Sequence, residues 1–320
     1  MNKTRLNYID IAKGIGIILV VLFHTPNIGS LCYVNNFYWG GYITTFYMPL
    51  FFILSGLFFN TNSIVKRIKK LSIPYFSFLI LGIITYITKC LITQNNIDWY
   101  KTYSAFLGNT KDYPNTPCWF LLSLITITIL YTLITKLKNK ANRIILSIIL
   151  SIIGYYLGKT HLNIPYYIDV SLLCNIFFVI GFEFRDIILN MKGYKTTITL
   201  LILSLLIYYH YPNITNISQN LIPYNILIFY ILSISSCFSV IGMSKFLQES
   251  KLEFYLAYLG KNSLIILCTH MILIPIGKPC WDMNMLFFNI IGTIIIIIIE
   301  IPIIKLVTNK FSCLIGNNIK

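Results

Sequence analysis

Charged residues are scarce in this chain, and acidic residues are the scarcest of them. The 320 residues include 10 Asp and Glu against 25 Lys and Arg, and charged residues make up 11% of the chain while hydrophobic residues make up 57%. Soluble globular domains carry about 25% charged residues, so this composition excludes an ordinary water-soluble protein. The alternating segments of about ten residues that mark a transmembrane β-barrel are also absent. The mean hydropathy of +0.75 therefore indicates an integral membrane protein built from helices.

The chain also lacks a Cys-x-x-Cys motif among its eight cysteines. This argues against a zinc or redox site, and because most of the cysteines fall in apolar runs, we expect small buried side chains and no bound metal. The net charge of +15 could indicate a nucleic-acid partner. The basic residues are scattered between apolar segments, however, and this is typical of membrane topology instead.

Ten apolar runs have about the 17–25 residues that a membrane-spanning helix needs. We therefore predict an all-α integral membrane protein, a bundle of about ten transmembrane helices that forms one domain over residues 1–320, with no soluble domain appended. Most basic residues share one side if the N-terminus is cytoplasmic, so the positive-inside rule predicts cytoplasmic termini and a multi-pass protein of the inner cell membrane. The predicted spans are 9–28, 37–60, 71–93, 117–136, 143–158, 168–184, 196–211, 223–243, 257–276 and 284–306.

The first predicted span contains three ionisable residues, Asp10, Lys13 and His24. Such groups cost roughly 2.5–3.5 kcal/mol at membrane depth on insertion scales, so they indicate a functional site. Eleven residues at about 100° each place Lys13 and His24 within roughly 20° on one helix face, about 16 Å apart, and Asp10 lies on the same stripe. His24 could accept a proton from a hydroxyl or bond a neighbouring helix. Lys13 could pair with Asp10, bind a phosphate or reach the lipid headgroups.

A basic cluster follows the second predicted span and consists of Lys66, Arg67, Lys69 and Lys70. It could bind anionic lipid headgroups, or it could bind the phosphates of a soluble cofactor. Ser55 stands near the end of the second span, where its hydroxyl could contact another helix or line a cavity.

Two further residues in apolar runs could belong to a site. Trp119, at the start of the fourth span, is most simply an interface anchor. His270, in the ninth span, is a second intramembrane histidine that could line the same cavity as His24.

Two loops carry weaker signals. The aromatic residues within 94–116 predict a helix that lies at the membrane interface. The stretch 213–218 formally contains two glycosylation acceptors, a pattern that is common by chance in Asn-rich chains.

Together these patterns resemble the membrane acyltransferase-3 family, and within it the branch of fucose 4-O-acetylase-like sugar O-acetyltransferases. The resemblance extends over essentially the whole chain through six short motifs in the family's order. They are a basic residue, ten residues and a histidine (Lys13 to His24), a Phe-rich element ending in Ser-Gly (Met48 to Gly56), basic residues before a Pro-Tyr pair (Lys69, Lys70, Pro74 and Tyr75), a Trp-Phe-Leu start (Trp119 to Leu121), an approximate Pro, Phe and Gly series (Pro165, Phe178 and Gly181), and a Gly-Lys-Asn-Ser-Leu segment with a later histidine (Leu259 to Leu264 with His270).

The resemblance implies transfer of an acetyl group from cytosolic acetyl-CoA to a hydroxyl of a cell-surface or lipid-linked sugar. His24 would be the general base, Lys13 or Ser55 would stabilise the oxyanion, and Asp10 would complete the catalytic stripe. The basic cluster at 66–70 would bind acetyl-CoA. The substrate cavity would be lined by Tyr47, Ser55, Trp119 and His270.

One departure and one alternative remain. Relatives often have a histidine where this chain has Tyr47, so Tyr47 must take over that role or the role is absent. Intramembrane Lys and His residues also mark transport pathways, so the alternative is a transporter or flippase of an envelope glycan or small metabolite.

Overall fold

The computed structural model of the chain describes residues 6–24, 38–108, 115–162, 164–191, 193–274 and 286–316. Within these residues the fold is all-helical, and extended pairing is limited to an isolated bridge between Asn216 and Leu221. Both predicted cytoplasmic termini, the span ends at 25–28, 37, 275–276 and 284–285, and Cys32 and Cys280 lie outside the described residues. Five described cysteines are buried, as predicted, and Cys313 is exposed.

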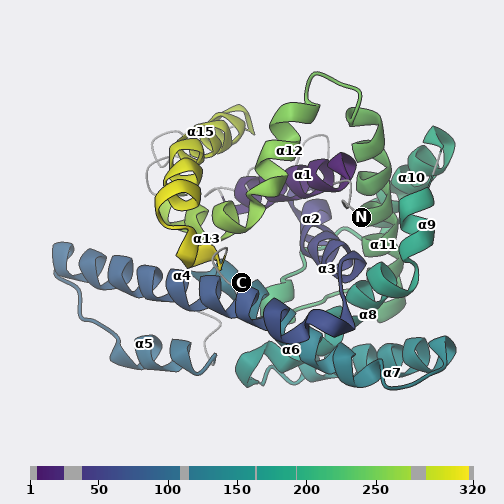
Figure 1. Cartoon of the computed structure of the whole chain (residues 1–320), viewed down its shortest axis with the longest axis horizontal. Coiled ribbons are helices and arrows are strands. Elements are labelled where there is room, and N and C mark those ends of the chain that lie inside the picture. Colours follow the sequence, from purple (N-terminus) through teal and green to yellow (C-terminus); the bar gives the residue numbers. More distant parts are fainter. Residues whose placement is uncertain are drawn as a thin grey trace.

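The helices of the described chain are shown in Figure 1. They are α1 (Asn7–His24), α2 (Trp39–Thr44), α3 (Tyr47–Leu57), α4 (Ile64–Ile92), α5 (Trp99–Phe106), α6 (Trp119–Ile134), α7 (Lys140–Lys159), α8 (Ile168–Glu183), α9 (Arg185–Asn190), α10 (Tyr194–His210), α11 (Ile226–Leu247), α12 (Glu253–Lys261), α13 (Ser263–Leu273) and α15 (Leu286–Lys310), with short 3₁₀ turns η2 (Thr61–Ser63), η3 (Thr116–Cys118), η4 (Pro165–Tyr167), η5 (Ile217–Gln219) and η7 (Ser312–Ile315).

Eight helical segments in the described residues are long and apolar enough to cross a membrane, and nine if the bent pair α12 and α13 counts as one span. The sequence predicts about ten. The difference lies in α10, which has 17 residues. At 1.5 Å per residue it is about 26 Å long, which is the lower limit of length for a membrane-spanning helix.

The first helix lies at the centre of the bundle. Helix α1 packs against α2, α3, α11, α12, α13 and α15, as Figure 1 shows. Its closest neighbour is α12, because Gly14 and Gly260 let the two backbones meet: a Cβ at Gly260 would overlap the carbonyl oxygen of Asp10. This packing holds the ionisable stripe of α1 inside the protein.

The second predicted span is broken into α2 and α3 at Thr45 and Phe46. Pro49 lies in the first turn of α3, where it has no N–H to offer the carbonyl of Thr45. The hydroxyl of Ser233 donates to that carbonyl instead, at 2.7 Å. A side chain from α11 therefore stabilises the break that the proline creates.

Helix α3 then packs tightly on α8 through a pair of glycines. A Cβ at Gly56 would overlap the carbonyl oxygen of Phe178, and a Cβ at Gly181 would overlap that of Ile53. Gly56 therefore serves helix packing, while its neighbour Ser55 is left to line a cavity.

Two other predicted segments have different bounds in the structure. The basic cluster does not precede a helix but forms the first turns of the 29-residue helix α4, which begins at Ile64. The aromatic loop contains the short helix α5, whose Trp99 and Tyr100 are exposed.

Candidate active site

A cavity of about 400 Å³ opens between α1, α3, α4, α6 and α13. We call it the Lys13 cavity. Among the described residues its wall contains four basic side chains, no acidic one, and a large apolar surface. The lining residues are Lys13, Phe51, Leu54, Ser55, Phe58, Ser63, Lys66, Arg67, Lys70, Leu71, Phe120, Leu121, Leu124, Ser263, Leu264 and Leu267. Such a cavity suits a ligand that is anionic at one end and apolar at the other.

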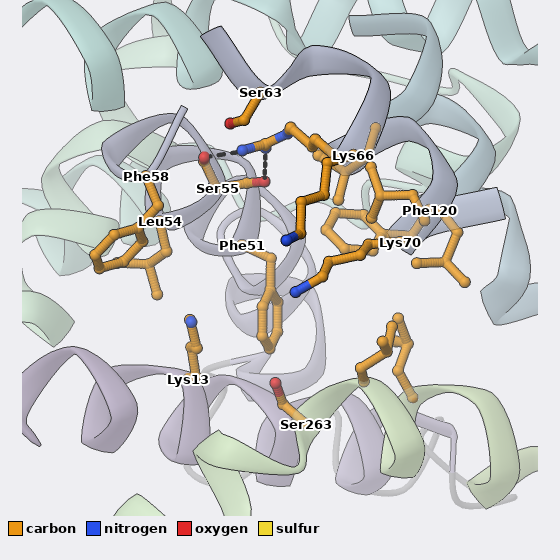
Figure 2. Close-up of a pocket in the computed structure, with 16 residues that line it drawn as sticks. Lys13, Phe51, Leu54, Ser55, Phe58, Ser63, Lys66, Lys70, Phe120 and Ser263 are labelled. Atoms are coloured by element: carbon orange, nitrogen blue, oxygen red, sulfur yellow. Dashed lines mark hydrogen bonds between the residues drawn. The ribbon is translucent and has the colours of Figure 1, made fainter. Parts of the chain in front are cut away.

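The basic residues converge because of their spacing on α4. Ser63, Lys66, Arg67, Lys70 and Leu71 follow an i, i+3, i+4, i+7, i+8 pattern, which is one face of a helix. Figure 2 shows the ammonium groups of Lys66 and Lys70 pointing into the same space as that of Lys13. Lys69 lies off this face and lines a neighbouring groove with Lys66, so it is not brought to the Lys13 cavity.

Arg67 is held in the cavity wall rather than extended into the space. Its Nη2 donates to the carbonyl oxygen of Ser55 at 3.1 Å and to Ser55 Oγ at 2.6 Å, and its Nε donates to Thr128 Oγ1 at 3.2 Å. The guanidinium also lies 5.6 Å from the centre of the Phe59 ring and 5.3 Å from that of Phe178. Arg67 therefore ties α4 to α3 and α6 and leaves its charge in the wall.

The sharp bend between α12 and α13 adds a helix terminus to this cavity. The two helices meet at an angle of 81°, and the first residues of α13, Ser263 and Leu264, line the Lys13 cavity. A helix N-terminus carries a partial positive charge of about half a unit. It therefore reinforces the field of the lysines.

A second pocket, of about 230 Å³, surrounds His24 at the other end of α1. We call it the His24 pocket. It is lined mainly by aromatic and uncharged polar side chains, and it contains the predicted residues Tyr47 and Trp119. The lining residues are Val20, Phe23, His24, Tyr47, Met48, Thr116, Pro117, Trp119, Asn216, Ser218, Gln219 and Leu267. Trp119 is 8% exposed, so it is part of the bundle interior rather than an exposed anchor.

The tautomer of His24 follows from its hydrogen bonds. His24 Nδ1 is 2.8 Å from the carbonyl oxygen of Val20, and His270 Nδ1 is 2.8 Å from that of Ile266. Because a carbonyl oxygen only accepts, Nδ1 of each ring carries a hydrogen. In each neutral ring Nε2 then holds a lone pair. The carbonyl bond of His24 uses Nδ1, so its Nε2 can accept a proton.

His270 lies behind His24. It is fully buried, and its Nε2 is 3.4 Å from Nδ1 of His24, where it accepts from the same Nδ1–H that binds Val20. The structure brings the two intramembrane histidines together. His270 backs the His24 ring, however, and does not line the pocket in the way that the sequence analysis considered.

The two cavities adjoin at Leu267. This residue of α13 lines both of them. Helices α1, α3 and α6 also contribute to both, with Tyr47 of α3 in one and Ser55, two turns on, in the other. Ser55 and Lys13 therefore share one cavity, apart from His24. Asp10 is buried at the packing of α1 on α12 and lines neither cavity.

A profile of one protein family, described as an acyltransferase domain, matches residues 6–305. The chain belongs to the acyltransferase-3 family. No curated protein and no solved structure matches it. With its apolar helices, the chain is a multi-pass membrane acyltransferase.

This acyltransferase has two features that sequence reasoning missed. Glu300 of α15 is fully buried, and both its oxygens lie 2.8 Å from the hydroxyl of Thr269, the neighbour of His270. The sequence contains a signal for it, because Glu300 is a single acidic residue within a run of isoleucines. The second feature is the loop at Asn216, Ser218 and Gln219, which lines the His24 pocket and belongs to none of the six motifs described above. Among the described residues no group of three His, Cys, Asp or Glu side chains could hold a metal ion.

Proposed function

We propose that this membrane acyltransferase moves an acetyl group from cytosolic acetyl-CoA to a hydroxyl of a cell-surface or lipid-linked sugar at the inner cell membrane. One observation carries the proposal: a cation-lined cavity for an anionic donor adjoins, at Leu267, a pocket that holds a histidine with an accepting nitrogen. Membership of the acyltransferase-3 family favours group transfer over the transport alternative.

The donor fits the Lys13 cavity by charge and polarity. Coenzyme A carries phosphates, which Lys13, Lys66 and Lys70 would bind as point charges. The N-terminus of α13 would add to this field. The apolar wall formed by Phe51 and Phe120 would hold the uncharged arm of the coenzyme, with the thioester directed toward Leu267.

The acceptor hydroxyl enters the His24 pocket in this proposal. Nε2 of His24 takes the hydroxyl proton as the oxygen attacks the thioester carbonyl carbon, and a tetrahedral intermediate forms. When the intermediate collapses, the carbon–sulfur bond breaks, the acetyl ester remains on the acceptor, and the imidazolium returns the proton to the thiolate. His24 begins and ends the cycle neutral.

The oxyanion donor is best assigned near His24. Lys13 is about 16 Å along the helix from His24 and lines the other cavity, as does Ser55. Tyr47 lies in the His24 pocket, at the position where relatives often have a histidine. Its hydroxyl can donate to a developing oxyanion, which would give Tyr47 the role that the departure in sequence left open.

Acetyl transfer can be measured on the purified full chain in lipid nanodiscs as free thiol released from acetyl-CoA in the presence of a glycan panel. We expect thiol release that depends on the glycan, and a loss of about 10²–10⁴-fold in His24→Ala. The control is His210→Ala, which removes an exposed histidine at the end of α10. Thiol release that is equal in His24→Ala and the wild type, or absent across the panel, would overturn the proposal.

A further inference from the structure

The loop between α10 and α11 supplies a side of the His24 pocket. Asn216, Ser218 and Gln219 line the pocket, and they are the main uncharged polar side chains there besides Thr116. The side chains of Ser218 and Gln219 are half-buried. None of them belongs to the motifs that define the family resemblance, so the proposed chemistry leaves them without a role.

This loop has a fixed shape of its own. Asn216 and Leu221 exchange two backbone hydrogen bonds, of 3.0 and 2.9 Å. Inside the turn, Oδ1 of Asn216 accepts from the hydroxyl of Ser218 at 2.7 Å and from the backbone N–H of Gln219 at 3.3 Å. The hydroxyl oxygen of Ser218 therefore has lone pairs left to accept from a ligand.

The loop is also anchored to the bundle at both ends. On one side, the N–H of Thr215 donates to Oγ1 of Thr44 in α2. On the other side, Nδ2 of the buried Asn220 donates to the carbonyl of Gly154 at 2.9 Å and to Oδ2 of Asp169 at 3.1 Å. These bonds reach α2, α7 and α8, so the loop is positioned by three helices.

A tyrosine fixes the start of the same loop. The hydroxyl of Tyr224 donates to the carbonyl of Asn213 at 3.0 Å. Burial raises the pKa of Tyr224, so its hydroxyl stays protonated and can donate at physiological pH. This loop is already ordered by its hydrogen bonds, so a ligand that binds it costs little conformational entropy. Such preorganisation favours selective binding.

We propose that the loop Thr215–Leu221 selects the acceptor, a pyranose ring. Ser218 accepts a hydrogen bond from one ring hydroxyl, the amide of Gln219 bonds to another, and the apolar face of the ring packs on Trp119. Hydroxyls that flank the reacting one would form hydrogen bonds with these polar groups, whereas an alcohol without neighbouring hydroxyls forms none of these bonds and binds more weakly. The identification of the ring's hydroxyl as the acetyl acceptor rests on the proposed function, but recognition of the ring does not.

Binding is therefore measured without acetyl-CoA. The probes are a panel of methyl hexopyranosides, with cyclohexanol as a ring of similar size that has one hydroxyl, and the readout is saturation-transfer NMR on the full chain in nanodiscs. The variants are Gln219→Ala and Ser218→Ala. Asn213→Ala is the matched control, because it removes an exposed amide of the same stretch that lies outside the pocket.

We expect at least one pyranoside to bind the wild type and the control alike, and to lose about tenfold in affinity in Gln219→Ala, the equivalent of one hydrogen bond of about 1.4 kcal/mol. Cyclohexanol should bind weakly and equally in all forms. The inference is overturned if no pyranoside binds the wild type, if cyclohexanol competes equally, or if both variants keep wild-type affinity. Pyranoside binding without thiol release would overturn the acetyl transfer alone.

Discussion

The imidazole rings of His24 and His270 stand edge to face with their centroids 5.0 Å apart, and Nε2 of His270 is 3.4 Å from Nδ1 of His24. The two residues are 246 positions apart in the sequence and come from α1 and α13. His270 and the carbonyl of Val20 hold Nδ1 of His24 between them. The pair therefore fixes which nitrogen of His24 faces the pocket.

His270 is thus a positioning residue. In His270→Ala, His24 keeps its place on α1 but loses the partner that holds its ring, so we expect kcat to fall about tenfold while the KM for acetyl-CoA is unchanged. Steady-state kinetics on the nanodisc protein measure both constants. A rise in that KM with kcat intact would contradict the assignment.

The lysines of the Lys13 cavity should determine donor affinity. Replacing both Lys66 and Lys70 by alanine removes two charged contacts to phosphate, so we expect the KM for acetyl-CoA to rise about ten- to a hundredfold at low salt, with a smaller effect at high salt. Isothermal titration with coenzyme A measures the same loss directly. Lys69→Ala is the control, because Lys69 lines the neighbouring groove; an equal loss in that variant would rule out the cavity as the donor site.

The junction at Leu267 should be the passage for the acetyl group. Leu267→Trp fills the junction, so we expect acetyl-CoA to bind with unchanged affinity while thiol release is lost. Leu267→Ala should keep both acetyl-CoA binding and thiol release. Met271→Trp is the control for added side-chain volume, because Met271 lies on the same helix but lines neither cavity. Full activity in Leu267→Trp would show that the thioester reaches His24 by another route.

The ion pair between Arg143 and Glu183 should stabilise the packing of α6, α7 and α8. Glu183 accepts two hydrogen bonds from the Arg143 guanidinium and one from the hydroxyl of Tyr131, and its side chain is 4% exposed. Hydrogen bonds to a charged group contribute roughly 1.5–3 kcal/mol, and this pair is part-buried, so Glu183→Gln should lower the melting temperature by several degrees. A thermal-shift assay checks this, with the exposed Glu249→Gln as control; equal shifts in both variants would contradict a specific role for the pair.

Local sequence signals predict the elements of the fold well, because they depend on runs and spacings within a single helix. The apolar stretch and the eleven-residue interval between Lys13 and His24 suffice for α1 and its stripe. Pro49 has no N–H, so local reasoning also indicates that one carbonyl in the preceding turn lacks its helical partner. It cannot predict that Ser233, on a distant helix, supplies the missing donor.

The site itself is only partly predictable, because its division into two cavities depends on contacts between helices that are remote in sequence. The stripe predicts Lys13 and His24 along one line. It does not predict Leu267 standing between their cavities. In the sequence, the stretch 213–218 shows only a formal glycosylation pattern. Nothing local indicates that Ser218 and Gln219 reach the His24 pocket.

The contact of the Lys13 cavity with the His24 pocket at one side chain, Leu267, has a kinetic consequence. Donor and acceptor can occupy the protein at the same time, so the proposed transfer needs no acetylated enzyme to carry the group from one to the other. Initial-rate plots at varied concentrations of both substrates would then intersect rather than run parallel, and either partner could arrive first.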